Sequence, residues 1–239
     1  VCREGGFLAR MWGCVRRAVD FVLGLQRPEG TVSWAKRADG SVSPRVLLTG
    51  CCSMYLSLGC AEKIAFFLGE EVPRWHDARR RLGEAIRTRP GLFDPTKSHF
   101  SMDWYYPVLS GALTGPAAEA RIDLSWETFA VPGWGIRCVS DRAWTTMAET
   151  AELSLALAAM GRFSAAETVL SWIADKKYAD GAFWTGVTFP DGVVYTAEKT
   201  AWTGAAVLLA ADLLYGLTPA GRLFRHDFSM PASALRAAG

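Results

Sequence analysis

Histidine is scarce in this chain of 239 residues, which contains only His76, His99 and His226. These three lie far apart, and the six cysteines include no C-x-x-C pair, so the sequence has no zinc-binding spacing. A large excess of one charge is also missing. The 26 basic and 24 acidic side chains give a net charge of +2, too small for a typical nucleic-acid surface. We expect no nucleic-acid partner and no metal, and the sequence identifies no cofactor.

Long apolar runs are missing as well. The longest nearly uncharged stretch, residues 200–217, contains Asp212 and falls short of the roughly 20 residues that a membrane-spanning helix needs. The first residues lack the apolar core of a signal peptide. We therefore expect no membrane span and a cytoplasmic protein whose cysteines are buried free thiols.

Segments of two kinds alternate along the chain. Four have a charged polar face and four carry no charge; the charged ones are 9–26, 74–89, 117–128 and 164–177, and the uncharged ones are 46–61, 104–115, 153–161 and 200–211. A helix that is apolar all round must be buried, whereas an amphipathic helix covers it from outside. The alternation predicts an all-α fold of about four outer–inner helical hairpins around a central cavity, with negligible strand content.

Glycine–aromatic loops precede the uncharged segments. They begin at Gly30, Gly91, Gly133 and Gly181, with an average spacing of about 50 residues that is typical of a helical hairpin with its loops. Ser and Thr are favoured helix caps. The inner helices are therefore predicted to start near Ser43, Ser101, Ser140 and Thr196.

Two of these loops resemble the QW motif of squalene and terpenoid cyclases. In that family the motif ties an outer helix to the loop before the next inner helix. The residues that follow its order here are Arg17-Ala18, Phe21-Val22, Gln26, Gly30 and Trp34. The tryptophan comes four residues after the glycine instead of two. A weaker copy runs through Trp172-Ile173, Lys177, Gly181 and Phe183.

Over its whole length the chain is similar to the (α/α) toroid superfamily, which includes terpenoid cyclases, protein prenyltransferases and six-hairpin glycosidases. Segments 100–109, 135–144 and 199–214 resemble actinobacterial proteins that carry the name prenyltransferase. A complete toroid has six hairpins, and four are counted here. We therefore expect residues 1–239 to form one incomplete toroid domain, a C-terminal fragment given its start at Val1, with self-association through the open edge.

Polar residues gather at the predicted N-terminal ends of the inner helices. If these helices are parallel, the polar groups meet at one mouth of an apolar cavity, as in a typical ligand site. Asp103 is the strongest catalytic candidate, because a carboxyl group among aromatic side chains suits general-acid use. Glu149 and Glu152 share one helical face, and for Glu152 a pairing with a neighbour competes with a role in the site. The predicted catalytic residues are Asp103, Glu149 and Glu198; the predicted substrate-binding residues are Arg45, Trp104, Tyr105, Tyr106, Asp141, Arg142, Trp144, Lys199 and Trp202.

Three functions suit this arrangement. The leading prediction is a terpenoid cyclase or prenyltransferase-like enzyme for an isoprenoid diphosphate, with aromatic walls for carbocations and basic residues for the diphosphate. The alternative is a six-hairpin glycosidase, in which aromatics stack on sugars and Asp103 pairs with Glu149 or Glu198 as acid and base. The third is a non-catalytic binding scaffold, since the D-x-D-D and D-D-x-x-D motifs of isoprenoid enzymes are missing. The expected partner is a small isoprenoid or carbohydrate.

Overall fold

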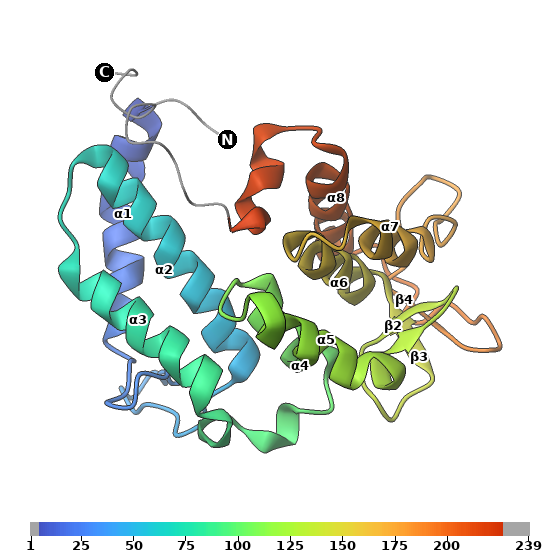
Figure 1. Ribbon diagram of the computed structural model, residues 1–239, viewed down its shortest axis with the longest axis horizontal. Coiled ribbons are helices and arrows are strands. Elements are labelled where there is room, and N and C mark those ends of the chain that lie inside the picture. Colours follow the sequence, from blue (N-terminus) through green and yellow to red (C-terminus); the bar gives the residue numbers. More distant parts are fainter. Residues whose placement is uncertain (1–4, 227–239) are drawn as a thin grey trace. The chain divides into compact units, whose positions relative to one another are not determined.

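The computed structural model describes residues 5–226, which are mostly helical (Figure 1). They form two compact units, residues 5–95 and 96–226. Val1, on which the expectation of a missing upstream part rests, lies outside the described residues. The single-domain organisation therefore stays a prediction.

The first unit is built from α1 (Gly5–Leu23), α2 (Leu48–Leu68) and α3 (Pro73–Thr88), followed by the short 3-10 helix η1 (Pro90–Leu92). α2 packs against both α1 and α3. It is the first predicted inner helix, and it continues past its charge-free part through Glu62 to a C-cap at Gly69, where φ is 72°. α1 and α3 are amphipathic and contact each other through Trp12 and Trp75, whose ring centroids are 5.4 Å apart.

The second unit follows the short helix η2 (Pro95–Lys97). Its helices are α4 (Ser101–Leu109), α5 (Gly115–Phe129), α6 (Met147–Ala159), α7 (Phe163–Ser171), α8 (Ala201–Tyr215) and the 3-10 helix η3 (Pro219–Arg225). α6 packs against α4, α7 and α8 and is buried from Met147 to Ala158. The all-round apolar pattern thus correctly places α6 at the centre of this unit.

A small antiparallel sheet lies next to α6 and is a departure from the expected negligible strand content. Its strands, in the order in which they pair, are β1 (Ala130–Val131), β2 (Gly135–Arg137), β3 (Trp144–Thr146) and β4 (Gly186–Thr188). Strands of two or three residues are too short for the alternating pattern by which strands are recognised in a sequence. The Thr150 hydroxyl of α6 accepts a hydrogen bond from the Ile136 N–H at 2.8 Å and ties the sheet to the helix.

A short closed turn recurs in the loops. Each copy has a β-bridge between residues six positions apart and a glycine of positive φ whose N–H donates to the carbonyl three residues earlier. The bridges are Gln26–Val32, Lys36–Val42 and Lys177–Phe183, and the glycines are Gly30, Gly40 and Gly181. The first and last copies lie in the two loops with QW-like spacing.

Gln26 connects the first of these turns to α3. Its Nε2 donates to the carbonyl oxygens of Gly30 at 2.9 Å and Ala78 at 2.8 Å, and its Oε1 accepts from Arg81 at 2.7 Å. Gly30 lies so close to α3 that a Cβ there would be 2.6 Å from the Arg81 carbonyl oxygen. The glutamine of the QW-like motif therefore ties this loop to an outer helix.

Apolar surface remains exposed on the inner helices. On α8, Leu208 is 70% exposed and Tyr215 is also exposed; on α2, Phe66 is exposed. Within the described residues, α2 is long and apolar enough to cross a membrane, and so is α8 if it is counted together with η3, to which it is bent by 94°. Core helices of soluble proteins have the same profile. The absence of a membrane span and the self-association both stay predictions.

The cysteines of the described residues form no disulfide, but they are not all buried as expected. Cys51 and Cys52 are buried in α2, whereas Cys14 is exposed on α1. Burial raises the pKa of the Cys51 thiol to about 11. The expected cytoplasmic location stays a prediction.

Candidate functional site

Two carboxyl groups lie buried in the first turns of α6. Glu149 and Glu152 are 8% and 9% exposed, on a helix whose other buried residues are uncharged. Buried acidic side chains are rare unless they are paired or functional. The helix begins directly after β3, and the sheet fixes this end through the bond between Thr150 and Ile136.

Glu152 is held by two tyrosine hydroxyls from α4. The Tyr105 hydroxyl donates to its Oε2 at 2.6 Å, and the Tyr106 hydroxyl donates to its Oε1 at 3.1 Å. Burial raises the pKa of Glu152 to about 7, and the charge of Glu149 acts in the same direction, while hydrogen bonds from Tyr105, Tyr106 and Trp202 partly oppose the rise. Glu152 is therefore a carboxyl group that retains a large protonated fraction at neutral pH, as a general acid requires.

Glu149 has a different neighbour. The Cys138 thiol, which follows β2, hydrogen-bonds to the Glu149 carboxylate. Burial first, and then the negative charge of Glu149, raise the pKa of Cys138 to about 12, so the thiol stays protonated. The two glutamates thus occupy distinct environments, which is how enzymes separate an acid from a base.

A proline inside α4 determines how that helix is held. Pro107 has no N–H to bond the Asp103 carbonyl four residues earlier. Instead, Arg121 of α5 donates from Nη2 to the Asp103 carbonyl at 2.6 Å and from Nε to the Trp104 carbonyl at 3.1 Å. The indole of Trp104 donates back to the Arg121 carbonyl at 2.8 Å. Arg121 therefore fixes the segment of α4 that carries the two tyrosines.

Three of the predicted site residues lie in the first turns of helices. Asp103 is buried in the first turn of α4, Glu149 in the first turn of α6, and Trp202 lies in the first turn of α8, 56% exposed. Tyr105, Tyr106 and Trp202 contact Glu152. Trp104 packs instead on Phe129, with ring centroids 5.3 Å apart, and is part of the core.

Other predicted residues do not lie on inner helices, contrary to the reasoning that grouped them. Asp141 and Arg142 are exposed in the connection between β2 and β3, and Glu198 and Lys199 are exposed in the loop before α8. Trp144 begins β3 and donates from Nε1 to the Tyr195 carbonyl at 2.7 Å. Lys199 pairs with Asp180, and the backbone carbonyl of Glu198 accepts from Tyr178 and Thr185.

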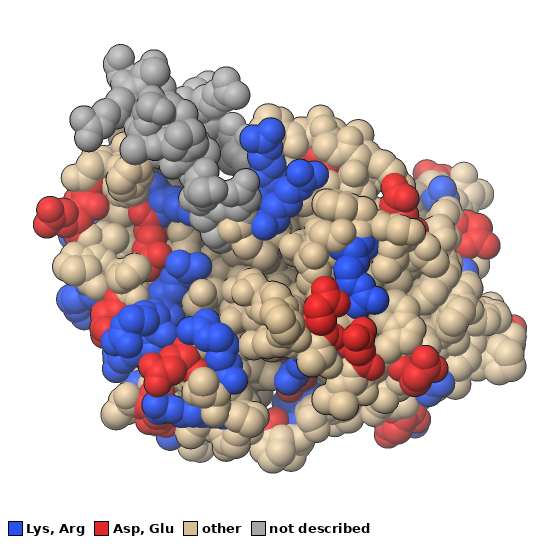
Figure 2. Space-filling view, in the orientation of Figure 1, with Lys and Arg blue, Asp and Glu red and all other residues tan. Residues whose placement is uncertain are grey.

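Arg45 belongs to the first unit, where its side chain is exposed and lies 3.8 Å from Asp94. Nearby in that unit, α3 carries the basic run Arg79–Arg81. Figure 2 shows basic and acidic side chains mixed on this face, and the run is paired with Glu62 and Asp77. The mixture of signs is typical of a solvated helix face.

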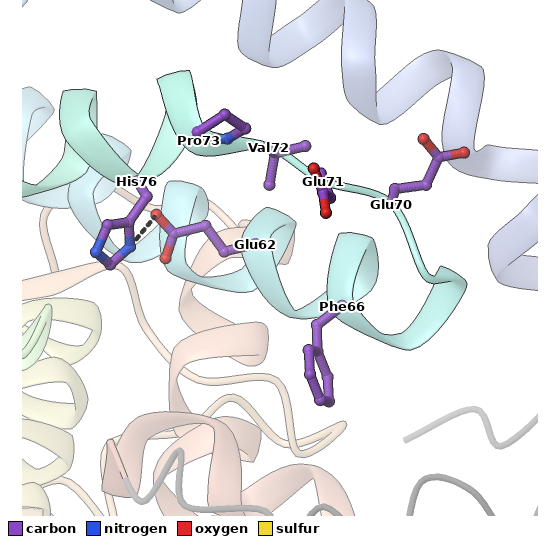
Figure 3. A pocket seen from close by; sticks show the side chains of 7 residues that line it. All are labelled: Glu62, Phe66, Glu70, Glu71, Val72, Pro73 and His76. Carbon is purple, nitrogen blue, oxygen red and sulfur yellow. Dashed lines mark ion pairs between the residues drawn. The ribbon is translucent and has the colours of Figure 1, made fainter.

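An open hollow of about 410 Å³ lies in the same unit between α2 and α3 (Figure 3). Glu62, Glu70 and Glu71 line it together with His76, whose Nδ1 is 3.7 Å from Glu62. Throughout residues 5–226, no group of three or more His, Cys, Asp and Glu side chains is arranged to hold a metal ion. The hollow offers acidic side chains but no acid–base pair comparable to that of α6.

Sequence reasoning missed the importance of Glu152. Its perturbation depends on Tyr105 and Tyr106, which lie 47 and 46 positions away in the chain. The available signal was the presence of two glutamates on one face of an otherwise uncharged helix.

The chain is similar to a curated protein and to a solved structure. No family model matches the sequence. The chain is similar to a protein of Mycolicibacterium hassiacum named MMP endo-(1,4)-3-O-methyl-alpha-D-mannosidase, with 48% identity over 219 residues. The match covers 92% of this chain and 60% of that protein, so the chain spans about three fifths of the relative's length.

Among solved structures, an inactive variant of the α-1,6-mannanase GH76A of Salegentibacter sp. HEL1_6, in complex with α-1,6-mannotriose, has the same fold. The TM-score is 0.62 at 16% identity, over 89% of this chain and 67% of that one. The fold is thus mostly helical and six-hairpin glycosidase-like, which confirms the predicted (α/α) toroid class. The leading prediction of an isoprenoid enzyme is wrong, because the 48% identical relative is named as a mannosidase. The resemblance to proteins called prenyltransferase therefore does not carry their chemistry over to this chain, because one fold can serve many reactions.

Proposed function

We propose that this chain belongs to a glycoside hydrolase that cleaves α-linked chains of 3-O-methylated mannose. Support comes from the relative that is 48% identical and is named for this activity. The observation that carries the proposal is the carboxyl pair of α6, in which buried Glu152 is bound by two tyrosine hydroxyls next to Glu149.

The reaction needs an acid and a base. Glycosidases use two carboxyl groups. One protonates the glycosidic oxygen of the leaving group, and the other acts as base or nucleophile at the opposite face of the sugar ring. Glu152, with its pKa raised to about 7 by burial, is the proposed acid. Glu149 is its proposed basic partner, and water supplies the oxygen that is added to the anomeric carbon. Asp103 remains a further proposed catalytic residue, because it lies buried on the same helix as the tyrosines.

Recognition of a methylated sugar favours apolar contacts beside the carboxyl pair. Trp202 is 56% exposed and lies close enough to Glu152 to lower its pKa, so its ring is available next to the acid. Aromatic rings of this kind offer large apolar area together with a polar edge. We propose that Trp202 contacts a sugar ring or its methyl group.

The test uses the full chain and an α-1,4-linked oligosaccharide of 3-O-methylmannose. New reducing ends are measured for the native protein, for Glu152→Gln, and for Glu167→Gln as a control at an exposed position on α7. We expect hydrolysis by the native chain and the control, and a loss of roughly 100-fold or more in Glu152→Gln. Equal activity of Glu152→Gln refutes the assigned acid.

Calorimetric binding of the same oligosaccharide completes the test. Binding without hydrolysis refutes the enzymatic proposal and supports the non-catalytic scaffold. Absence of both binding and hydrolysis refutes the carbohydrate assignment for this chain.

A further inference from the structure

The two tyrosines of α4 contact different oxygens of Glu152. Tyr105 is fully buried, and its hydroxyl is 2.6 Å from Oε2. Tyr106 is only partly buried, and its hydroxyl is 3.1 Å from Oε1. The two oxygens of this carboxyl group therefore differ in both hydrogen-bond length and access.

Tyr105 keeps its own proton and donates it to Glu152 in a hydrogen bond. Burial, followed by the charges of Glu152 and Glu149, raises the pKa of the Tyr105 phenol well above its usual value, so its proton stays on the ring oxygen. A short O–H···O bond to a carboxylate is among the stronger hydrogen bonds in proteins. Since Tyr105 has no exposed surface, it cannot touch a substrate, and any effect on catalysis must pass through Glu152.

The position of Tyr105 is itself fixed by its helix. Arg121 bonds the carbonyls of Asp103 and Trp104, which directly precede Tyr105 in the chain. The tyrosine ring is packed 5.4 Å from that of Tyr106 and 6.3 Å from that of Trp104, measured between centroids. The donor is thus held in place before any ligand binds.

We propose that Tyr105 is a positioning residue for the acid: its hydroxyl keeps Oε2 of Glu152 as an acceptor, so that the transferable proton is carried on Oε1, on the side of Tyr106. The inference rests on the proposed function, which it deepens by naming the oxygen that delivers the proton.

Oε1–H gives its proton to the glycosidic oxygen as the bond between that oxygen and the anomeric carbon breaks, with the bonding electrons remaining on the oxygen. Glu152 is left as a carboxylate, and the Tyr105 and Tyr106 hydroxyls donate to its two oxygens. Water adds to the anomeric carbon, and the proton it loses passes to Glu149.

Within residues 5–226, the groups that shift the pKa of Glu152 come from three helices. They are Glu149 on its own helix, Tyr105 and Tyr106 on α4, and the indole of Trp202 on α8. Among these donors Tyr105 lowers the pKa of Glu152 most, Tyr106 less and Trp202 least. Removal of Tyr105 should therefore change the titration of the acid more than removal of Tyr106.

The experiment compares Tyr105→Phe, Tyr106→Phe and the control Tyr215→Phe, which alters an exposed hydroxyl at the end of α8. Glu152 is titrated directly in the full chain by carboxyl ¹³C NMR, with Glu152→Gln to identify its signal. We expect the Glu152 midpoint to rise by about 1 pH unit in Tyr105→Phe, by less in Tyr106→Phe, and not at all in the control. This measurement needs no substrate.

The same variants are then assayed for hydrolysis across pH. In Tyr105→Phe, the pH at which kcat declines on the alkaline side should rise together with the Glu152 midpoint. The maximal kcat should fall about tenfold, while KM changes little. Loss of stability without a change in midpoint or limb would overturn the positioning role. If the native chain has no hydrolytic activity, the proposed function is refuted, but the titration still decides whether Tyr105 controls the pKa of Glu152. An unchanged Glu152 midpoint in Tyr105→Phe overturns the inference.

Discussion

Glu152 should make this protein less stable as the pH rises through neutrality. In the folded chain burial raises its pKa from 4.5 to about 7. The folded state therefore binds the Glu152 proton more tightly than the unfolded state does. By linkage, stability is highest below pH 4.5 as far as this group is concerned, and it falls as the pH rises towards 7. Each pH unit of difference corresponds to about 1.4 kcal/mol, so ionisation of Glu152 costs about 3 kcal/mol of unfolding free energy.

Glu152→Gln removes this dependence while it keeps the shape of the side chain. The amide can still accept a hydrogen bond from Tyr105. We expect the variant and the native chain to differ little in stability at pH 4.5, and the variant to be about 3 kcal/mol more stable at pH 8.

Urea unfolding at pH 4.5, 6, 7 and 8 gives the free energy of unfolding of both proteins. Subtracting one value from the other removes most of the pH dependence that comes from titratable groups present in both. Glu167→Gln is the matched control, because it removes an exposed carboxylate from α7 and leaves Glu152 in place. A flat difference for Glu152→Gln, or one in which the native chain gains stability as the pH rises, would refute the burial argument.

Three further predictions concern single side chains. Asp103→Asn should lower hydrolysis by roughly 100-fold or more, and unchanged activity in a folded variant would remove Asp103 from the site. Arg121→Met should cost about 2–4 kcal/mol in urea unfolding, since two buried carbonyls lose a charged donor; Arg37→Met, on an exposed turn, is the control and should cost little. Gly30→Ala should be more destabilising than Gly40→Ala by about 1–3 kcal/mol in thermal unfolding, because both have positive φ but only Gly30 faces a backbone oxygen at 2.6 Å; equal costs would contradict the close approach.

The helices were predictable because buried helix faces contain few charged residues. α6 and α8 were recognised from their lack of charge along one or more turns, and the amphipathic α1 and α3 from their polar faces. These patterns extend over many residues, so the two adjacent charged residues Glu62 and Lys63 in α2 do not hide them.

Helix starts were less predictable, and this misplaced part of the site. The cap signal at Ser140 precedes the true start of α6 at Met147, because Thr145 and Thr146 lie in β3 instead. The signal at Thr196 precedes the true cap, Thr200, whose side chain accepts from the Thr203 N–H. Any Ser or Thr in a loop is a candidate helix cap, and the tertiary structure determines which of them caps a helix.

The state of Glu152 could not be read from the sequence either. The sequence shows that an acid lies on an apolar helix, but the pKa depends on the pairing of α6 with α4 and on which hydroxyls face the carboxyl group. That information lies in contacts between segments that are distant in the chain.

The recurring closed turn has a consequence for how this protein can change over time. Because the β-bridge joins the two ends of each turn, the chain leaves almost where it entered. The tips of these turns differ in what they contact: Asp39, in the second turn, is exposed, whereas Gly30, in the first, lies against α3. Substitutions at Asp39 should therefore leave the flanking segments in place, and substitutions at Gly30 should not. The second turn, where Gly40 has open space around it, is thus a position at which residues can be changed or inserted while the helices that carry the buried carboxyl pair keep their places.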